Sequence, residues 1–457
     1  MYNYFTTIDM TELHTNDVPL NVLSQRRTTS TDTDTVSTTE EEYYPDGGWK
    51  AYLVLCGSFL GLVVNLGLIN SIGAIQAYVS THQLAGVAAS SVAWIFSIYL
   101  ALAYAIGIFI GPIFDRHGAL ELLVTATILL FAGLMGTASS TKISHFILSF
   151  ICIGIGNGVG LTPLVAVINH WFFKRRGNST GIATSGGSVG GLVFPLMLRH
   201  MYLTSGFVWA IRTLAFVCLG CMVSAVILAR ERLTREPEPP ADSESKWKTF
   251  SNKIGLFSLS KLKNRTYALM IIGVFCTELS LVLILTYFAT YAMAQGVSES
   301  TSYLLLTVWN ATGILGRWIP GLASDYYGKF NVNILMIFGL DLCVFVLWLP
   351  FGSSLKILYA FAALGGYFSG LILTMVPSCL AQISPVSEFG ERYGILNAVL
   401  SIGNLVGLPI GAAIIGNGSV HNYTVFVGVI GVLLVTGTFF WILSRASIVG
   451  ARLNVKV

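Results

Sequence analysis

Charged side chains are scarce in this sequence: 11% of its 457 residues are Asp, Glu, Lys or Arg, whereas 54% are hydrophobic. Soluble domains usually carry roughly 25% charged residues. A bilayer core needs roughly 20 consecutive apolar residues per helix, and the chain provides many such runs, separated by short polar breaks. The composition therefore argues against a water-soluble fold and predicts an integral membrane protein.

The sequence also lacks the patterns of several other protein classes. Its seven cysteines are scattered singly through apolar runs, so no disulfide framework is expected. Cys218-x-x-Cys221 lies inside an apolar run without a further metal ligand nearby. H-E-x-x-H, a nucleophile elbow and a paired-carboxylate motif are missing. The sequence predicts no enzyme, no metal site, no cofactor and no nucleic-acid partner.

The apolar runs predict an all-α fold of twelve transmembrane helices in two groups of six. The first six spans are expected at 50–72, 88–114, 119–138, 143–168, 179–202 and 207–229. The second six are expected at 267–293, 301–322, 332–350, 355–376, 393–415 and 423–444. The halves thus cover 46–229 and 267–445, joined by a polar, basic linker over 230–266. Residues 1–45 contain no signal-peptide pattern and are expected to form a disordered cytoplasmic tail. Residues 446–457 are expected to form a second cytoplasmic tail.

The distribution of Lys and Arg over the loops predicts the orientation. If both ends of the chain are cytoplasmic, nine basic residues between positions 230 and 265 lie inside, while only Lys142, Arg199 and Lys356 lie outside. This excess follows the positive-inside rule. Of the N-x-S/T matches, only Asn417 and Asn422 then face outward. They are the candidate glycosylation sites, in a short loop close to the membrane.

An internal repeat links the two halves. Residues 111–118 (GPIFDRHG) close the second span and residues 321–328 (GLASDYYG) close the eighth, both with the spacing G-x-x-x-D-x-x-G. A parallel repeat of two six-helix halves resembles the major facilitator superfamily, whose substrate site lies between the halves near the midplane. The resemblance implies that fold for everything after Gly47.

The two aspartates of the repeat predict a cytoplasmic gate. Asp115, followed by Arg116, is expected to face the start of the eleventh span near Arg392. Asp325 is expected to face the start of the fifth span near Arg176. A carboxylate is favourable at the positive end of a helix. The alternative is a solvated turn in which glycine supplies backbone freedom and the aspartate only caps it.

Two further segments narrow the family. Residues 46–52 (DGGWKAY) precede the first span, and residues 171–177 (WFFKRRG) precede a glycine-rich fifth span that includes Gly186, Gly187, Gly190 and Gly191. Together they resemble the fungal branch of the monocarboxylate porter family. The resemblance implies a multi-pass protein of the plasma membrane or, as the alternative, the vacuolar membrane. The glycines also suit close packing of helices.

Few charges lie inside the spans, and a charge at mid-membrane needs a reason to stay there. Arg317 lies seven residues after Asn310, on the same helix face. The family resemblance implies that an arginine at this place holds the substrate, and a guanidinium can bind a carboxylate bidentately. The alternative is that Arg317 snorkels to the cytoplasmic surface.

Other polar residues complete the predicted cavity. Glu278, near the middle of the seventh span, is a candidate proton carrier. Asp341 is expected to have a structural partner, and Arg212 to anchor an outer helix end. The remaining candidate substrate contacts share helix faces by their spacing or line the expected cavity: Thr184, Ser188, Asn70, Asn397 and Asn404, with Tyr287, Trp309 and Tyr367 as walls.

The sequence departs from the lactate-type members of the family at two positions. Those members carry a lysine in the first helix and an aspartate one turn before the arginine, where this chain has Asn70 and Gly313. We therefore expect a secondary transporter of an organic anion or larger metabolite. Membrane lipid is expected to surround the protein, and protons are a candidate coupling ion. Riboflavin-type vitamin uptake, efflux of a fungal secondary metabolite and a non-transporting nutrient sensor are the alternatives.

Overall fold

The computed structural model describes residues 45–87, 89–232, 263–385, 388–416 and 418–450, together with residues 452, 455 and 456. Nearly all of the expected N-terminal tail, most of the linker and the candidate glycosylation site Asn417 lie outside these residues. Within them, every span expected from the sequence coincides with helix. The prediction of an all-α membrane fold is therefore confirmed.

The first half of the chain forms six spans. They are α2 (Trp49–Tyr78) with the π-helical turn η2 (Val79–Gln83), α3 (Ala89–Ala105) with α4 (Gly107–His117), α5 (Leu120–Ala138), α6 (Ile143–Trp171), α7 (Arg176–Thr204) and α8 (Gly206–Leu228). The second span was expected as one helix but is interrupted at Ile106, between α3 and α4.

The second half forms six more spans. They are α10 (Arg265–Ala294), α11 (Glu299–Tyr327), α12 (Lys329–Leu342) with the π-helical segment η4 (Cys343–Trp348) and α13 (Leu349–Phe351), α14 (Leu355–Gln382), α15 (Phe389–Ile415) and α16 (Val420–Val449). Eleven of the spans in the described residues are long and apolar enough to cross a membrane. The remaining one, α11, is 29 residues long and less apolar because it carries Asn310, Arg317 and Asp325.

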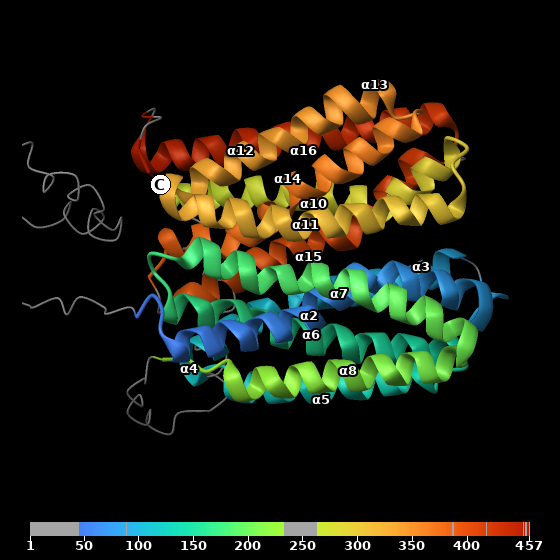
Figure 1. Ribbon diagram of the computed structural model, residues 1–457, viewed down its shortest axis with the longest axis horizontal. Helices are drawn as coiled ribbons and strands as arrows, with labels where there is room; N and C mark the ends of the chain where they lie inside the picture. The colour runs from blue at the N-terminus through green and yellow to red at the C-terminus, as the bar shows by residue number, and fades with distance from the viewer. Residues whose placement is uncertain are drawn as a thin grey trace, which may run out of the picture.

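The halves form two bundles that lie side by side, with all long helices running in the same general direction (Figure 1). The start of α2 and the end of α16 lie at the same end of the molecule, which we call the terminal face (Figure 1). The halves meet through two matching pairs of spans. The second span, α3 and α4, packs on α15, and α7 packs on α11.

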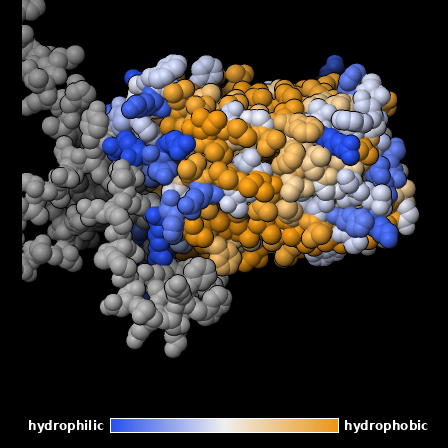
Figure 2. All heavy atoms as spheres, turned by 90° about the horizontal axis from the view of Figure 1, so that it is seen from below, coloured by the Kyte–Doolittle hydropathy of each residue, from blue (hydrophilic) through white to orange (hydrophobic). Residues whose placement is uncertain are grey.

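On the face that Figure 2 shows, apolar residues cover most of the middle of the molecule, and hydrophilic residues gather toward both ends. Large apolar side chains project from the outer helices, among them Ile128 on α5, Leu148 on α6 and Leu335 on α12, which are 63%, 70% and 64% exposed. Large apolar side chains on the outer surface suit contact with the hydrocarbon core of a bilayer, because that core contains no water. The chain is a multi-pass membrane protein.

Candidate functional site: a cavity between the halves

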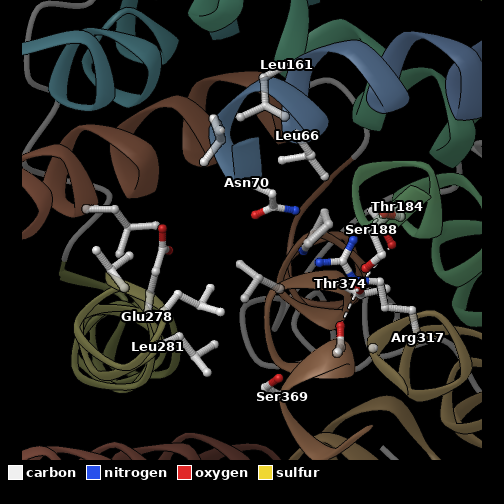
Figure 3. Close-up of a pocket in the computed structure, with 18 of the residues that line it drawn as sticks. Leu66, Asn70, Leu161, Thr184, Ser188, Glu278, Leu281, Arg317, Ser369 and Thr374 are labelled. Carbon is white, nitrogen blue, oxygen red and sulfur yellow. Dashed lines mark hydrogen bonds between the residues drawn. The ribbon is translucent and has the colours of Figure 1, made fainter. Parts of the chain in front are cut away.

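A cavity of about 120 Å³ lies between the two halves. Both halves line it, and it includes seven of the polar residues singled out from the sequence: Asn70, Thr184, Ser188, Glu278, Asn310, Arg317 and Asn397. Trp309 also lines it, as expected. Apolar side chains of both halves, such as Leu66, Leu161 and Leu281, form the rest of the walls (Figure 3).

Arg317 reaches from α11 across to the other half. Its Nη1 donates a hydrogen bond of 2.5 Å to the carbonyl oxygen of Thr184 on α7. A Cβ added to Gly187 would lie 3.1 Å from that Nη1, so glycine leaves the guanidinium room against α7. The side chain therefore points into the cavity. This direction argues against the alternative that Arg317 snorkels to the cytoplasmic surface.

The hydroxyls beside Arg317 also join the halves. Thr184 Oγ1 lies 2.9 Å from Thr374 Oγ1 of α14, and Ser378 Oγ donates to Thr180 Oγ1 at 3.1 Å. Ser188, one turn beyond Thr184, lines the same cavity. The arginine therefore sits in a polar patch built from α7, α11 and α14.

Two amides line the cavity near this patch. Asn70 Nδ2 donates to the carbonyl oxygen of Gly187 at 3.0 Å, and Asn310 Nδ2 donates to that of Leu306 at 3.1 Å. Each side chain thus commits a donor to the backbone. Each amide also carries an oxygen that can accept a hydrogen bond from a solute.

Glu278 on α10 forms a second polar group in the cavity. The residue is 2% exposed, and neither carboxylate oxygen accepts a hydrogen bond within the described ranges. Tyr104 of α3 and Asn404 of α15 lie close enough to interact with it. Asn404 does not itself line the cavity, contrary to expectation, but interacts with this carboxylate.

Two tyrosines of this group were missed by sequence reasoning. Tyr104 and Tyr393 both line the cavity and interact electrostatically with Glu278. Nothing in the sequence separates Tyr104 from the other aromatic residues of its apolar run. Tyr393 could have been noticed, because it lies one turn before Asn397 on the same helix face.

Two expected walls lie elsewhere. Tyr287 packs edge-on against Phe426, at a centroid distance of 5.3 Å, and its hydroxyl donates to the carbonyl oxygen of Leu408 at 2.7 Å. Tyr367 turns to Phe368 and places its backbone against Gly316. Neither tyrosine lines the cavity. Both were assigned from the helix alone, whereas the face they occupy packs against neighbouring helices.

The terminal face is closed by two matching contacts between the halves. Asp115, at the end of α4, accepts hydrogen bonds from the backbone N–H groups of Gly390 (3.1 Å) and Glu391 (2.9 Å), which begin α15. Asp325, at the end of α11, accepts them from Gly177 (2.7 Å) and Asn178 (2.8 Å), which begin α7. Each carboxylate lies at the positive end of a helix from the other half.

Arginine side chains surround these contacts. Arg392 donates to Glu388 at 3.0 Å and to Ser384 at 3.2 Å, both in its own half. Arg176 donates to the carbonyl oxygens of Phe172 and Asn169, while Arg116 is exposed. The observed carboxylate partners are thus backbone N–H groups at the two helix starts. The role of these residues as a gate stays a prediction.

Glycines allow the backbones to meet at both contacts. A Cβ on Gly394 would lie 2.2 Å from the carbonyl oxygen of Gly107, and one on Gly181 would lie 2.5 Å from that of Arg317. The sequence holds a second repeat here that was overlooked: G-x-x-x-G-I over 177–182 and again over 390–395. Gly118 and Gly328, which end the first repeat, adopt φ values of 82° and 96° that favour glycine.

The two family signature segments meet on the terminal face. Asp46 Oδ1 accepts hydrogen bonds from the backbone N–H groups of Phe173 and Lys174, each at 2.7 Å, and its own N–H donates to Trp171. Asp46 has a φ of 50°, which is unusual for a residue other than glycine. The carboxylate thus holds the loop that leads into α7, whose start also contacts Asp325.

Three other residues singled out from the sequence lie away from the cavity. Asp341 Oδ2 accepts a hydrogen bond of 2.7 Å from Thr438 Oγ1, which is the structural partner expected for it. Arg212 lies over the ring of Trp209, with 5.4 Å from Cζ to the ring centroid. Asn422, in the first turn of α16, donates from Nδ2 to the carbonyl oxygen of Ile415 at 3.0 Å, and its glycosylation stays a prediction.

A central cavity between two six-helix halves, closed by matching contacts at one face, defines a membrane transporter that works by alternating access. The chain belongs to the major facilitator superfamily, whose family model matches residues 53–354 and 329–451. It is a secondary transporter of a small organic solute and not an enzyme.

Several curated proteins are similar along most of their length. The riboflavin transporter MCH5 of Saccharomyces cerevisiae is 41% identical over 426 residues, which cover 91% of this chain and 82% of the relative. MFS-type transporter 1 of an Ophiocordyceps species is 34% identical, with 94% and 92% covered. The fujikurins efflux protein of Gibberella fujikuroi is 31% identical, with 83% and 79% covered.

Solved structures show the same fold at low sequence identity. The human organic anion transporter MFSD10 is 14% identical with a TM-score of 0.65, over 85% of this chain and 98% of that one. The fucose:proton symporter FucP of E. coli is 16% identical with a TM-score of 0.65, over 86% and 98%. At such identities the likeness concerns the fold alone.

Proposed function

We propose that this transporter moves a riboflavin-like solute, meaning an uncharged planar heterocycle that carries an imide and a chain of hydroxyls. The observation that carries the proposal is the presence of one carboxylate, Glu278, and one arginine, Arg317, in a single cavity. Their opposite charges offset each other, so the cavity favours a neutral solute with hydrogen-bonding groups over a simple anion. The 41% identity to a riboflavin transporter supports this choice.

Lactate-type transport fits the cavity less well. Asn70 and Gly313, which stand where lactate-type porters are expected to carry a lysine and an aspartate, both line the cavity. An amide and a glycine supply neither a titrating group nor bulk. The space around Arg317 therefore suits a larger solute than a short carboxylic acid. Of the two solutes expected from the sequence, an organic anion or a larger metabolite, this favours the larger metabolite.

The terminal face is proposed to be cytoplasmic, in the plasma membrane, with the vacuolar membrane as the alternative. The support is the charge of the described loops. The terminal face carries Lys174, Arg175, Arg230 and Arg265 among others, whereas the opposite face carries Lys142, Arg199 and Lys356. This asymmetry follows the positive-inside rule. The meeting of the two signature segments at Asp46 supports placement in the fungal branch of the monocarboxylate porter family.

Efflux of a hydrophobic metabolite is the second candidate. The observation that favours it is the apolar share of the cavity wall, which includes Ile69, Val165, Leu285 and Leu400. A relative with 31% identity is a fujikurins efflux protein. Direction of transport separates the two candidates, because an exporter lowers the amount of solute inside the cell.

Uptake by cells tests the proposal. A yeast strain that can neither make nor import riboflavin should grow at low external riboflavin when it expresses this chain, and should take up labelled riboflavin with saturable kinetics. Surface labelling confirms that the protein reaches the membrane. Correctly inserted protein that leaves both growth and uptake at the background of empty cells would refute the proposal.

A further inference from the structure

No donor among the described residues makes a well-formed hydrogen bond to either carboxylate oxygen of Glu278, which is 2% exposed, although Tyr104 and Asn404 lie close enough to interact with it. Burying an ionised carboxylate without a partner is costly. The carboxylate of Glu278 therefore needs either a hydrogen-bond donor that arrives with the solute or a bound proton. The side chains that interact with it come from both halves: Tyr104 on α3, and Tyr393 and Asn404 on α15.

A complementary group faces Glu278 from the other side of the cavity. Arg317 Nε is buried without a hydrogen-bond acceptor in the described part of the chain, while Nη1 is held by Thr184. Figure 3 shows Glu278 and Arg317 on opposite sides of the open space, with apolar side chains such as Leu281 and Leu66 in the walls between them. The cavity thus offers an acceptor at one side and donors at the other.

We infer that Glu278 is a recognition residue that accepts a hydrogen bond from the imide N–H of the solute, while Arg317 donates to its carbonyl or hydroxyl oxygens. This inference rests on the proposed function and specifies how the solute is oriented. An imide presents one N–H between two carbonyl groups. Glu278 takes the N–H, and Tyr104 and Tyr393, which line the same cavity, supply hydroxyls for a neighbouring carbonyl. The polyol chain then extends toward Arg317 and Ser188.

The orientation has a consequence for pH dependence that differs from proton symport. A proton on Glu278 removes the charge that strengthens the bond to the imide, so protons and solute compete for the same group. Tyr104, Tyr393 and Asn404 interact with the carboxylate, and Arg317 is the cation across the cavity. Solute binding should therefore weaken as the pH falls. A proton carrier in a symporter would make binding stronger instead.

Chemical substitution on the solute tests the inference. Riboflavin and its N3-methyl derivative, which lacks the imide N–H, would be titrated into the purified full-length protein, with binding followed by flavin fluorescence. We expect the wild type to bind riboflavin at least about tenfold more tightly, because a hydrogen bond to a charged acceptor is lost on methylation. Glu278→Met, which removes the acceptor, should bind both compounds within about twofold of each other.

Asp341→Asn is the matched control, because Asp341 is a membrane carboxylate outside the cavity. It should retain the full preference for riboflavin. Equal binding of both compounds by the wild type, or an unchanged preference in Glu278→Met, would overturn this inference while leaving the proposed function intact. Failure of the wild type to bind either compound would overturn both.

Discussion

The closed terminal face and the central cavity are built on different plans. At the terminal face each half contributes the same element: Asp115 of the first half holds the start of α15, and Asp325 of the second half holds the start of α7. In the cavity the halves differ, because Glu278 and Arg317 both come from the second half. The first half supplies uncharged groups such as Asn70, Ser188 and Tyr104.

The proposed roles of the two regions, a gate and a solute site, would account for this difference. Closing and opening a face requires both halves to move alike, so a duplicated sequence element can serve twice. Holding one asymmetric solute requires different groups on its two sides, so the repeat has to diverge there. At the terminal face, equivalent substitutions in the two halves should therefore have effects of equal size. In the cavity, substitutions in the two halves should have effects of different size.

The largest effect is expected for Arg317→Gln. The change keeps a polar side chain but removes the fixed charge that reaches Thr184 from α11. Transport of labelled riboflavin should fall to background while the amount of protein at the cell surface stays normal. Arg212→Gln is the control, since Arg212 lies on α8 over Trp209, and it should transport like the wild type. Full activity of Arg317→Gln would return this arginine to the snorkelling alternative.

An intermediate effect is expected for Gly181→Ala and Gly394→Ala. In each variant the new methyl group meets a backbone oxygen of the other half, at 2.5 Å and 2.2 Å respectively. Overpacking typically costs about 1–3 kcal/mol, and here it opposes closure of the terminal face. Both variants should make cysteines placed in the cavity more reactive from the terminal side, and to a similar extent.

Gly220→Ala is the matched control for these two variants, because a Cβ at Gly220 meets nothing within 4 Å. It should leave cysteine reactivity unchanged. A strong effect of one glycine substitution with none from the other would break the comparison, since it would show that the two contacts do not act alike.

The smallest effect is expected for Asp115→Asn and Asp325→Asn. Each substitution removes a negative charge from the start of a helix, an interaction worth roughly 0.3–1 kcal/mol. Each should shift the population modestly toward the state open at the terminal face, and the double variant should add the two shifts. Unchanged accessibility of cavity cysteines in the double variant would refute the gate.

The sequence was sufficient for the regular parts of this molecule. Apolar runs revealed the twelve spans, and the G-x-x-x-D-x-x-G spacing placed Asp115 and Asp325 at the ends of matching spans. Both signals are local, because they depend on period and position within one span. The interruption of the second span at Ile106 carries no such signal, since its sequence reads as one continuous apolar run.

The residues that line the cavity were harder to predict, because they depend on which face of each helix is turned toward the other half. Polar residues that are costly in lipid, such as Arg317 and Glu278, were identified by that cost. Tyrosines gave no comparable signal: Tyr104 was missed, while Tyr287 and Tyr367 were wrongly placed in the wall. The contact between Asp46 and the loop before α7 joins distant segments and was also beyond reach.

Solute counterflow in proteoliposomes tests the central claim most directly. Vesicles that contain the purified protein and are loaded with unlabelled riboflavin should accumulate labelled riboflavin transiently from outside, because alternating access exchanges one molecule for another without an external gradient. Arg317→Gln vesicles should show none. Absence of counterflow with protein that is folded and inserted, or counterflow of equal size in Arg317→Gln, would contradict the account.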